Sequence, residues 1–366
     1  MNKVIIFGTG RSGSSLLLRL IDGSKGLSCY PLDFNYFHTF ESTTWKRKLR
    51  AWAAHMVLGK RTNQYLEQYY FDRWRESQYR EISKTYLSNI DEPINEFYET
   101  NDLMVGCNTK GRTEAILQFF KQIGIVYGHA KNDDIVVFKT TECSKVEDYQ
   151  KLYPDAKCIH IIRDPVTTYS SFKRAMYFKK LPPWWLGGDC LREVIDGRFL
   201  PHIRIIKNKL QTKPNGHLLV RYEDILEDAD RELNRIAKFL KVVPKADTKT
   251  QTFFGGRLFK SMPAHPSQKN VVTPKQVTPN LDIHAGYKKV IELREEILIR
   301  ELTSREVSDF GYASNDKCNH EDLLNMWRLP SKWELRFWFK LLSTLRYYYC
   351  NRRWIREHFK HRANGL

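Results

Sequence analysis

The chain has 366 residues, 42% of them hydrophobic and 28% charged, which is enough apolar sequence for one large globular domain or two ordinary ones. Its formal net charge of +18 predicts a surface that attracts anions, which are found on nucleic acids, acidic membranes and phosphorylated substrates. The seven cysteines are scattered without a C-x-x-C pair, which argues against a disulfide framework or a zinc site and indicates reduced, intracellular thiols.

Apolar runs bounded by turn residues predict β-strands at 3–8, 135–140, 157–163 and 217–222. Each run precedes a segment of helical periodicity, so the pattern predicts an α/β fold with a parallel sheet. Residues 41–130 carry many charged and aromatic side chains at helical spacing, which predicts a helical insertion over the sheet edge. Because the first strand begins at once, we expect no signal peptide or N-terminal anchor.

The first turn, GTGRSGSS at 8–15, is compatible with three kinds of ligand. Its G-x-G-x-x-G spacing is typical of dinucleotide sites, which need an acidic residue about 20 positions later, where Asp33 stands. A Walker A loop needs a lysine at the position of Ser14, which disfavours an ordinary nucleoside triphosphatase. In the third interpretation the turn and the following helix N-terminus hold an anion, and Arg11 neutralises charge in place of a metal.

A second turn of this kind, RDPVTTYSS, begins at Arg163 directly after another apolar run. Asp164 is placed to cap a helix whose first residue is Pro165, so the strand delivers the arginine to a helix N-terminus. Ser171 falls on the second turn of that helix, where its hydroxyl can point toward the strand end. Two anion sites at neighbouring strand ends predict a ligand with two separated phosphate-like groups.

Together these turns resemble the hallmarks of the sulfotransferases that use 3′-phosphoadenosine 5′-phosphosulfate (PAPS). The resemblance covers about residues 1–315 and implies a three-layer, P-loop-like α/β fold with a central parallel sheet flanked by helices. It implies that the 5′-phosphosulfate is held by Gly10, Arg11, Ser12, Gly13, Ser14 and Ser15. It also implies that Arg163 and Ser171 hold the 3′-phosphate, that Tyr222 lies near the adenine, and that no metal takes part.

Shorter motifs of the same family follow along the chain. Lys139 and Thr140 end a strand, VRYEDIL occupies 220–226, and DFGY occupies 309–312. His160, inside an apolar strand, is expected to be a packed core residue.

A basic stretch rich in Gly, Pro and Ser, at 251–282, predicts a long ordered loop or lid, after which a helix resumes at about Ile283. In the family a basic loop closes over the 3′-phosphate with an Arg-Lys-Gly sequence that this chain lacks. Arg257, Lys260 and Lys269 are candidates for that role by position only.

Sulfuryl transfer requires stabilisation of the departing phosphate oxygen and deprotonation of the acceptor. Arg11 is the candidate cation because a guanidinium stays charged at any working pH, and Lys139 is a candidate assistant. Asp33 is the candidate general base, because several branches of the family place a carboxylate just after the second strand. His38 and Glu142 are its competitors.

The remaining segment, 316–366, is predicted to be a basic, aromatic, helical extension of the 1–315 domain. Its stretch KWELRFWFKLLSTLRYYY places cations on one stripe and aromatic and aliphatic side chains on the rest, which is typical of an amphipathic helix. Such a helix either lies on an anionic membrane or packs against the domain or a second subunit. The membrane interpretation makes the protein cytoplasmic and peripheral to the inner face of a membrane.

Three hypotheses about function therefore stand. The first is PAPS-dependent transfer to a hydroxyl, which the resemblance to carbohydrate-directed branches narrows to a glycan or glycolipid. The second is a kinase-like or NAD-binding enzyme that uses the glycine-rich loop. The third is a non-catalytic protein that binds anions or nucleic acid, although no helix-turn-helix, zinc-finger or RNA-binding signature occurs.

Overall fold

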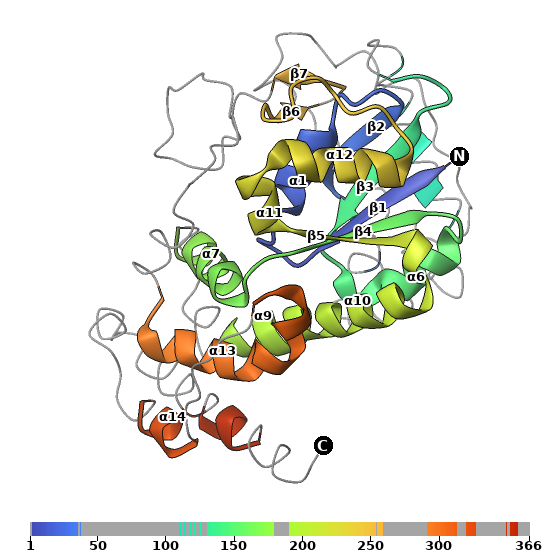
Figure 1. Ribbon diagram of the computed structural model, residues 1–366. Coiled ribbons are helices and arrows are strands. Elements are labelled where there is room, and N and C mark those ends of the chain that lie inside the picture. The colour runs from blue at the N-terminus through green and yellow to red at the C-terminus, as the bar shows by residue number, and fades with distance from the viewer. Residues whose placement is uncertain are drawn as a thin grey trace, which may run out of the picture.

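The computed structural model describes residues 2–35, 37, 130–178, 190–253, 255–258, 291–312, 320–326, 349 and 352–357, together with helical positions 110, 113, 114, 117, 118, 121 and 125. Within these residues a five-stranded parallel sheet has the order β2-β3-β1-β4-β5 (Figure 1). Its strands are β1 (Lys3–Gly8), β2 (Leu27–Asp33), β3 (Ile135–Thr140), β4 (Lys157–Ile162) and β5 (His217–Arg221). The predicted parallel α/β sheet is confirmed.

Helices cover both faces of the sheet (Figure 1). One face carries α1 (Ser14–Ile21), α11 (Tyr222–Glu227) and α12 (Ala229–Leu240), whose apolar side chains pack with those of β1, β2 and β4. The other face carries α6 (Val146–Leu152), α7 (Pro165–Phe178), α9 (Cys190–Val194), α10 (Leu200–Thr212) and α13 (Leu293–Val307). Every residue of β1 is buried, as expected for a central strand with helices on both faces.

Short elements complete the described chain. They are the 3₁₀ turns η2 (Cys143–Lys145), η4 (Pro214–Gly216) and η6 (Ser308–Phe310), the π-helix η3 (Ile195–Phe199), the hairpin of β6 (Thr252–Phe253) and β7 (Arg257–Leu258), and helix α14 (His320–Met326). Helix α13 begins at Leu293, whereas the predicted start at about Ile283 lies outside the described residues. Residues 291 and 292 are not helical, and Glu292 starts the helix at Leu293 by forming a capping box with Glu295.

Most of the predicted insertion lies outside the described residues. The described positions between 110 and 125 are helical, and two of them contact the domain that contains the sheet. The Lys3 ammonium pairs with the Glu114 carboxylate at 2.5 Å, and the Tyr153 hydroxyl donates to Thr113 Oγ1 at 2.6 Å. These positions agree with a helical insertion packed against the domain.

The C-terminal extension is described at α14, at residue 349 and at 352–357. Trp354 is 4% exposed and Ile355 fully buried, and both belong to the apolar cluster that α7, α9, α10 and α13 form. Glu357 lies 3.9 Å from the Arg192 guanidinium of α9. This end of the extension therefore packs on the domain. The amphipathic stretch at 332–349 lies outside the described residues except for Tyr349, and no helix in the described part of the chain is long and apolar enough to span a bilayer.

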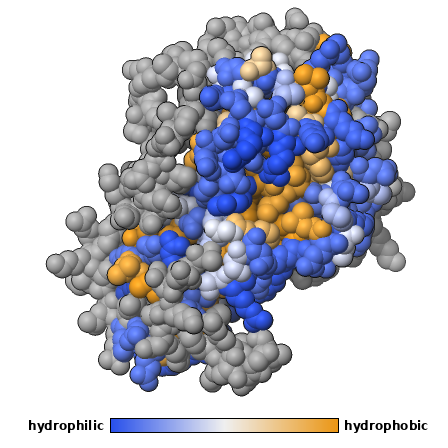
Figure 2. Space-filling model, in the orientation of Figure 1, coloured by the Kyte–Doolittle hydropathy of each residue, from blue (hydrophilic) through white to orange (hydrophobic). Residues whose placement is uncertain are grey.

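Strand β5 forms one edge of the sheet and faces the viewer in Figure 1. Apolar surface lies along it between the hydrophilic surfaces of α12 and α10 (Figure 2). The Arg235 guanidinium of α12 reaches over this edge and donates to the Leu219 carbonyl oxygen at 2.8 Å. A side chain thus satisfies a backbone acceptor that an edge strand would otherwise present to another chain.

Three buried histidines form a hydrogen-bonded chain beneath β4. His160 lies 3.3 Å from His202 Nε2 and 2.8 Å from His217 Nδ1, and the other nitrogen of His217 lies 2.8 Å from Gln150 Nε2. The expectation that His160 is a core residue is confirmed, since it is 0% exposed. Burial lowers the pKa of His202 to about 3 and that of His217 to about 4, and it lowers the pKa of His160 well below its usual value.

These histidines are expected to destabilise the protein in mild acid. Between about pH 6.5 and pH 4 the histidines of the unfolded chain bind protons, whereas the buried imidazoles of the native protein stay neutral. The free energy of unfolding therefore falls as pH falls. Each histidine contributes a slope of up to about 1.4 kcal/mol per pH unit. Denaturant unfolding of wild type and of His202→Leu between pH 7 and pH 4 should give a shallower slope for the variant, and parallel curves would contradict the assignment.

Candidate active site

The turn between β1 and α1 depends on two glycines and on a strained arginine. A Cβ on Gly8 would lie 2.5 Å from Ser12 Oγ and 2.7 Å from the Ile161 side chain, so only glycine fits there. Gly13 has φ of 101° at the N-cap of α1. Arg11 has φ of 75°, a left-handed conformation that is unfavourable for a residue with a Cβ and is typical of functional loops.

This turn offers hydrogen-bond donors to an anion. No side chain caps the N-terminus of α1, so its first N–H groups and the positive end of its dipole face outward from the turn. Ser12 Oγ is fully buried and has no hydrogen-bond partner. An orphaned buried hydroxyl beside an uncapped helix N-terminus is what an oxyanion would satisfy, so these residues fit a phosphate or phosphosulfate.

The second turn has the expected local structure. Asp164 Oδ1 accepts the Thr167 N–H at 2.8 Å and Pro165 is the first residue of α7, so the predicted cap is confirmed. Arg163 follows the last residue of β4 directly, and its Nε donates to Thr167 Oγ1 at 3.0 Å. The strand end and the first turn of α7 together hold this guanidinium.

The two turns touch each other. Arg163 Nη1 lies 3.5 Å from the carbonyl oxygen of Arg11, and Arg11 Nε donates to Ser171 Oγ at 3.1 Å. Ser171, which was predicted to point toward the strand end, accepts from the arginine of the first turn. The helix that follows β4 and the loop that follows β1 are therefore in direct contact.

Tyr222 stands between the two turns at the start of α11. Its ring lies beneath the Arg163 guanidinium at 4.3 Å from Cζ to the centroid, a cation–π contact. A Cβ on Gly13 would lie 2.2 Å from its Cδ2, so the ring also packs against the first turn. The Tyr222 ring thus contacts both the first turn and the Arg163 guanidinium.

Asp33 and Lys139 form an ion pair at the ends of β2 and β3. The Lys139 side chain is 4% exposed and its ammonium contacts Asp33 Oδ1, whereas the Asp33 side chain is 46% exposed. Burial lowers the pKa of nearby Arg19 to about 10, and the Asp33 carboxylate opposes that shift. The two candidate catalytic groups are thus in direct contact, and the carboxylate remains open to solvent.

Glu142, a competing candidate base, has a different environment. It is 8% exposed, and its Oε2 accepts the Tyr149 hydroxyl at 2.5 Å and the Phe37 N–H at 3.2 Å. These contacts tie Glu142 into the structure around the end of β3. The third candidate, His38, lies outside the described residues.

The sequence interpretation missed two residues that tie separate segments together. Asn35 Oδ1 accepts the Thr141 N–H at 2.9 Å and the Thr140 hydroxyl at 3.0 Å, so it ties the end of β3 to the end of β2. Asp22, after α1, accepts the Gly255 and Gly256 N–H groups at 2.9 and 2.8 Å. Burial raises the pKa of Asp22, and these hydrogen bonds oppose that shift. A short polar side chain after a strand or helix is the only sequence signal for either role.

Asp22 therefore anchors the β6–β7 hairpin, which occupies the beginning of the predicted basic loop. Arg257 is the first residue of β7. Lys260 and Lys269, the other basic candidates of that loop, lie outside the described residues.

The sheet order arranges the site residues in a row. Reading across the carboxyl edge from β2 to β5, Asp33 comes first, then Lys139, the glycine turn, Arg163 and Tyr222. The helix after β1 and the helix after β4 lie on opposite faces of the sheet, so the carboxyl ends of these two strands form a topological switch point (Figure 1). Ligands of open α/β sheets bind at such points.

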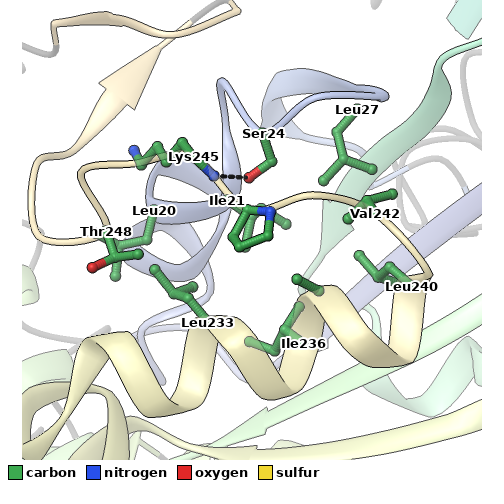
Figure 3. A pocket seen from close by; sticks show the side chains of 12 residues that line it. Leu20, Ile21, Ser24, Leu27, Leu233, Ile236, Leu240, Val242, Lys245 and Thr248 are labelled. Carbon is green, nitrogen blue, oxygen red and sulfur yellow. Dashed lines mark hydrogen bonds between the residues drawn. The ribbon is translucent and has the colours of Figure 1, made fainter.

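An apolar pocket lies between α1 and α12, away from the two anion turns (Figure 3). Leu20, Ile21 and Leu233 line it, and it also includes Leu27 at the amino end of β2. The Lys245 N–H donates to Ser24 Oγ at 3.3 Å, and the Lys245 ammonium donates to the Thr250 carbonyl oxygen at 2.6 Å and to Thr252 Oγ1 at 2.9 Å. The pocket lies at the amino end of β2, whereas ligands of open α/β sheets bind outside the carboxyl ends of the strands.

A family model described as the sulfotransferase family matches residues 3–244 of the chain. Curated protein sequences give no match. A similar solved structure is the sulfotransferase domain of the Synechococcus PCC 7002 olefin synthase, with 15% identity, 86% of this chain and 96% of that chain covered, and a TM-score of 0.45.

Two further structures show the same level of likeness. The sulfotransferase domain from the curacin biosynthetic pathway has 17% identity, covers 85% of this chain and 98% of its own, and gives a TM-score of 0.46. Sulfotransferase STF9 from Mycobacterium avium has 12% identity, 86% and 78% coverage, and a TM-score of 0.43. These likenesses are loose, whereas the family match spans both anion turns and all the strands of the parallel sheet. The chain therefore belongs to the sulfotransferase family, whose members are enzymes that transfer sulfate.

Proposed function

We propose that this enzyme moves the sulfuryl group of PAPS to an acceptor hydroxyl by metal-independent in-line displacement. The observation that supports this most is the junction of two cation-bearing turns at adjacent strands, with the unpartnered Ser12 hydroxyl inside the first. PAPS carries a phosphosulfate and a separate 3′-phosphate, and so supplies one anion for each turn. A Walker-type triphosphate site would need a lysine where this chain has Ser14.

Each turn has its own part in donor binding. The 5′-phosphosulfate would be held by Gly10, Arg11, Ser12, Gly13, Ser14 and Ser15. Arg163 would hold the 3′-phosphate, and Ser171, which accepts from Arg11, would join the two sites. Tyr222 would stack near the adenine, and Arg257 would close from the hairpin side.

In the reaction the acceptor oxygen forms a bond to sulfur while the bond from sulfur to the bridging phosphate oxygen breaks. Negative charge develops on that oxygen, and the products are a sulfate ester and adenosine 3′,5′-bisphosphate. Arg11 would stabilise this charge, because the first turn holds its backbone beside the anion site. The charge of a guanidinium does not depend on pH in the working range, so no metal ion is required for this role.

Asp33 would accept the proton of the acceptor hydroxyl. Its carboxylate is half exposed, so an acceptor can reach it, and its contact with the buried Lys139 ammonium fixes its position at the end of β2. We therefore propose that Lys139 acts through Asp33 rather than on the leaving oxygen. The contacts of Glu142 with Tyr149 and Phe37 support a structural role for that residue instead.

For the acceptor we propose a hydroxyl on a glycan or glycolipid. The support is the sequence resemblance to carbohydrate-directed branches and the amphipathic stretch within 317–366, which would bring the enzyme to a membrane surface. Trp354 and Ile355 are buried in the domain and would take no part in such a contact.

Calorimetric titration tests the donor. Adenosine 3′,5′-bisphosphate is expected to bind without Mg²⁺ and about 10–100-fold more tightly than adenosine 5′-monophosphate, since a charged hydrogen bond at Arg163 contributes roughly 1.5–3 kcal/mol. Arg163→Ala should reduce this ratio to near one. A preference of the wild-type protein for ATP with Mg²⁺, or for NAD, over the bisphosphate would overturn the proposal.

A further inference from the structure

The second anion turn is held from behind by a carboxylate that the reaction itself does not use. Glu223, the second residue of α11, accepts the Asp164 N–H on Oε1 at 3.0 Å. That N–H belongs to the peptide group that joins Arg163 to Asp164. Because Asp164 is the cap of α7 and Pro165 has no N–H, no backbone acceptor within the helix serves this peptide group. Glu223 therefore fixes the backbone from which the Arg163 side chain projects.

The other oxygen of Glu223 is bound by the end of the domain. Its Oε2 accepts the hydroxyl of Tyr312, the last residue of the DFGY motif, in a short hydrogen bond. Tyr312 is 9% exposed, and burial together with the Glu223 carboxylate raises the pKa of its hydroxyl far above the working range. The hydroxyl is therefore protonated at neutral pH and donates to Glu223.

The position of Tyr312 is itself well determined. Its ring lies 4.6 Å from Cζ of Arg221, the last residue of β5. Gly311 has φ of 77°, and a Cβ there would lie 3.2 Å from the Arg221 guanidinium, so the preceding turn requires glycine. Phe310 is 8% exposed in the apolar cluster of α13. The motif thus anchors the hydroxyl on the core.

Further charged groups surround the contacts of Glu223 with Asp164 and Tyr312. Arg300 Nη1 of α13 lies 3.9 Å from Asp164 Oδ2, and Arg221 Nη1 lies 3.5 Å from Asp224. The Arg163 guanidinium lies on the ring of Tyr222, the neighbour of Glu223. The start of α11 therefore holds Arg163 twice, by its side chain through Tyr222 and by its backbone through Glu223.

We propose that Glu223 and Tyr312 are positioning residues for the donor's 3′-phosphate. They form a link from the DFGY motif to the peptide bond of Arg163 and so hold its guanidinium in the binding direction. This role rests on the proposed function, because it assumes that Arg163 receives the 3′-phosphate. The hydrogen bond from Tyr312 to Glu223 joins two motifs, VRYEDIL and DFGY, that lie more than 80 residues apart in the sequence, and both then act on Arg163.

The test compares two nucleotides that differ only in the 3′-phosphate. Calorimetry would measure the Kd of adenosine 3′,5′-bisphosphate and of adenosine 5′-monophosphate for wild type, Glu223→Ala, Glu223→Gln and Tyr312→Phe. Glu223→Ala is expected to reduce the preference for the bisphosphate about tenfold, with the monophosphate affinity unchanged. Glu223→Gln should retain most of it, because an amide oxygen still accepts the Asp164 N–H. Tyr312→Phe should fall between them.

Glu227→Ala is the matched control. It lies on the same helix, its side chain is 74% exposed, and its ion pair with Arg231 spans 3.9 Å, so it should leave the ratio unchanged. An unchanged ratio in Glu223→Ala and Tyr312→Phe, or an equal loss of affinity for both nucleotides, would overturn the positioning role. If wild type itself shows no preference for the bisphosphate, the proposed function fails, and that result is distinct from either outcome.

Discussion

Replacement of Arg11 by alanine is expected to lower kcat by about 10²–10³-fold, the effect of removing one donor that stabilises developing negative charge. It should also weaken binding of adenosine 3′,5′-bisphosphate, since the guanidinium contributes to the first anion site. The physical reason is that the charge on the leaving oxygen grows only as the sulfur bond breaks, so the loss is larger in the transition state than in the bound state.

The strained backbone at this position offers a sharp control. With φ of 75°, Arg11 occupies a conformation that alanine also finds unfavourable but glycine adopts readily. Arg11→Gly should therefore be at least as stable to denaturant as Arg11→Ala and equally inactive, which assigns the loss to the guanidinium and not to the turn. Arg11→Lys keeps the charge without the planar fork and should recover only part of the rate. Full kcat in the glycine variant would remove Arg11 from the chemistry.

The second large effect is expected at Asp33. Asp33→Asn should lower kcat by about 10²–10⁴-fold, the usual contribution of a general base, while the affinity for adenosine 3′,5′-bisphosphate stays the same. The asparagine keeps the shape of the side chain and removes its capacity to accept a proton. Steady-state measurement of kcat and calorimetric measurement of the Kd check these two expectations separately.

Glu142→Gln is the control for this experiment, because Glu142 is the neighbouring carboxylate that was considered for the same role. Its contacts with the Tyr149 hydroxyl and the Phe37 N–H predict reduced stability to denaturant with most of kcat retained. If Asp33→Asn is fully active while Glu142→Gln loses about 10²–10⁴-fold in kcat, the base is Glu142 and not Asp33.

Much of the local structure was predictable. The strands at 3–8 and 135–140 have the predicted bounds, and the other two predicted strands end one residue early, at Ile162 and Arg221. The cap at Asp164 and the helix start at Pro165 were also predicted correctly, because capping depends on residues next to one another. The helix predicted from about Ile283 to 312 was wrong at residues 291 and 292, which are not helical because the capping box of Glu292 starts α13 there; Ile283 itself lies outside the described residues.

The site was predictable in its parts but not in its contacts. Arg11, Arg163 and Ser171 were identified from turn chemistry, yet nothing in their spacing indicated that Ser171 would accept from Arg11. Asp33 was a candidate base and Lys139 a candidate cation, but their pairing across 106 positions was not expected. The contacts of Asn35 and of Glu223 in the VRYEDIL motif could not be predicted, because each residue acts on the backbone of a distant segment.

The amino-acid sequence by itself determined the parallel α/β class, the glycine turn after the first strand and the cation at each helix start. These features follow from hydrophobic period and turn chemistry, which act over a few residues. The tertiary structure alone decided that β3 lies between β1 and β2, and hence that Lys139 meets Asp33. It also decided that Tyr222 contacts both anion turns. Strand order is set by the packing of whole helices on the two faces of the sheet, and no local pattern encodes it.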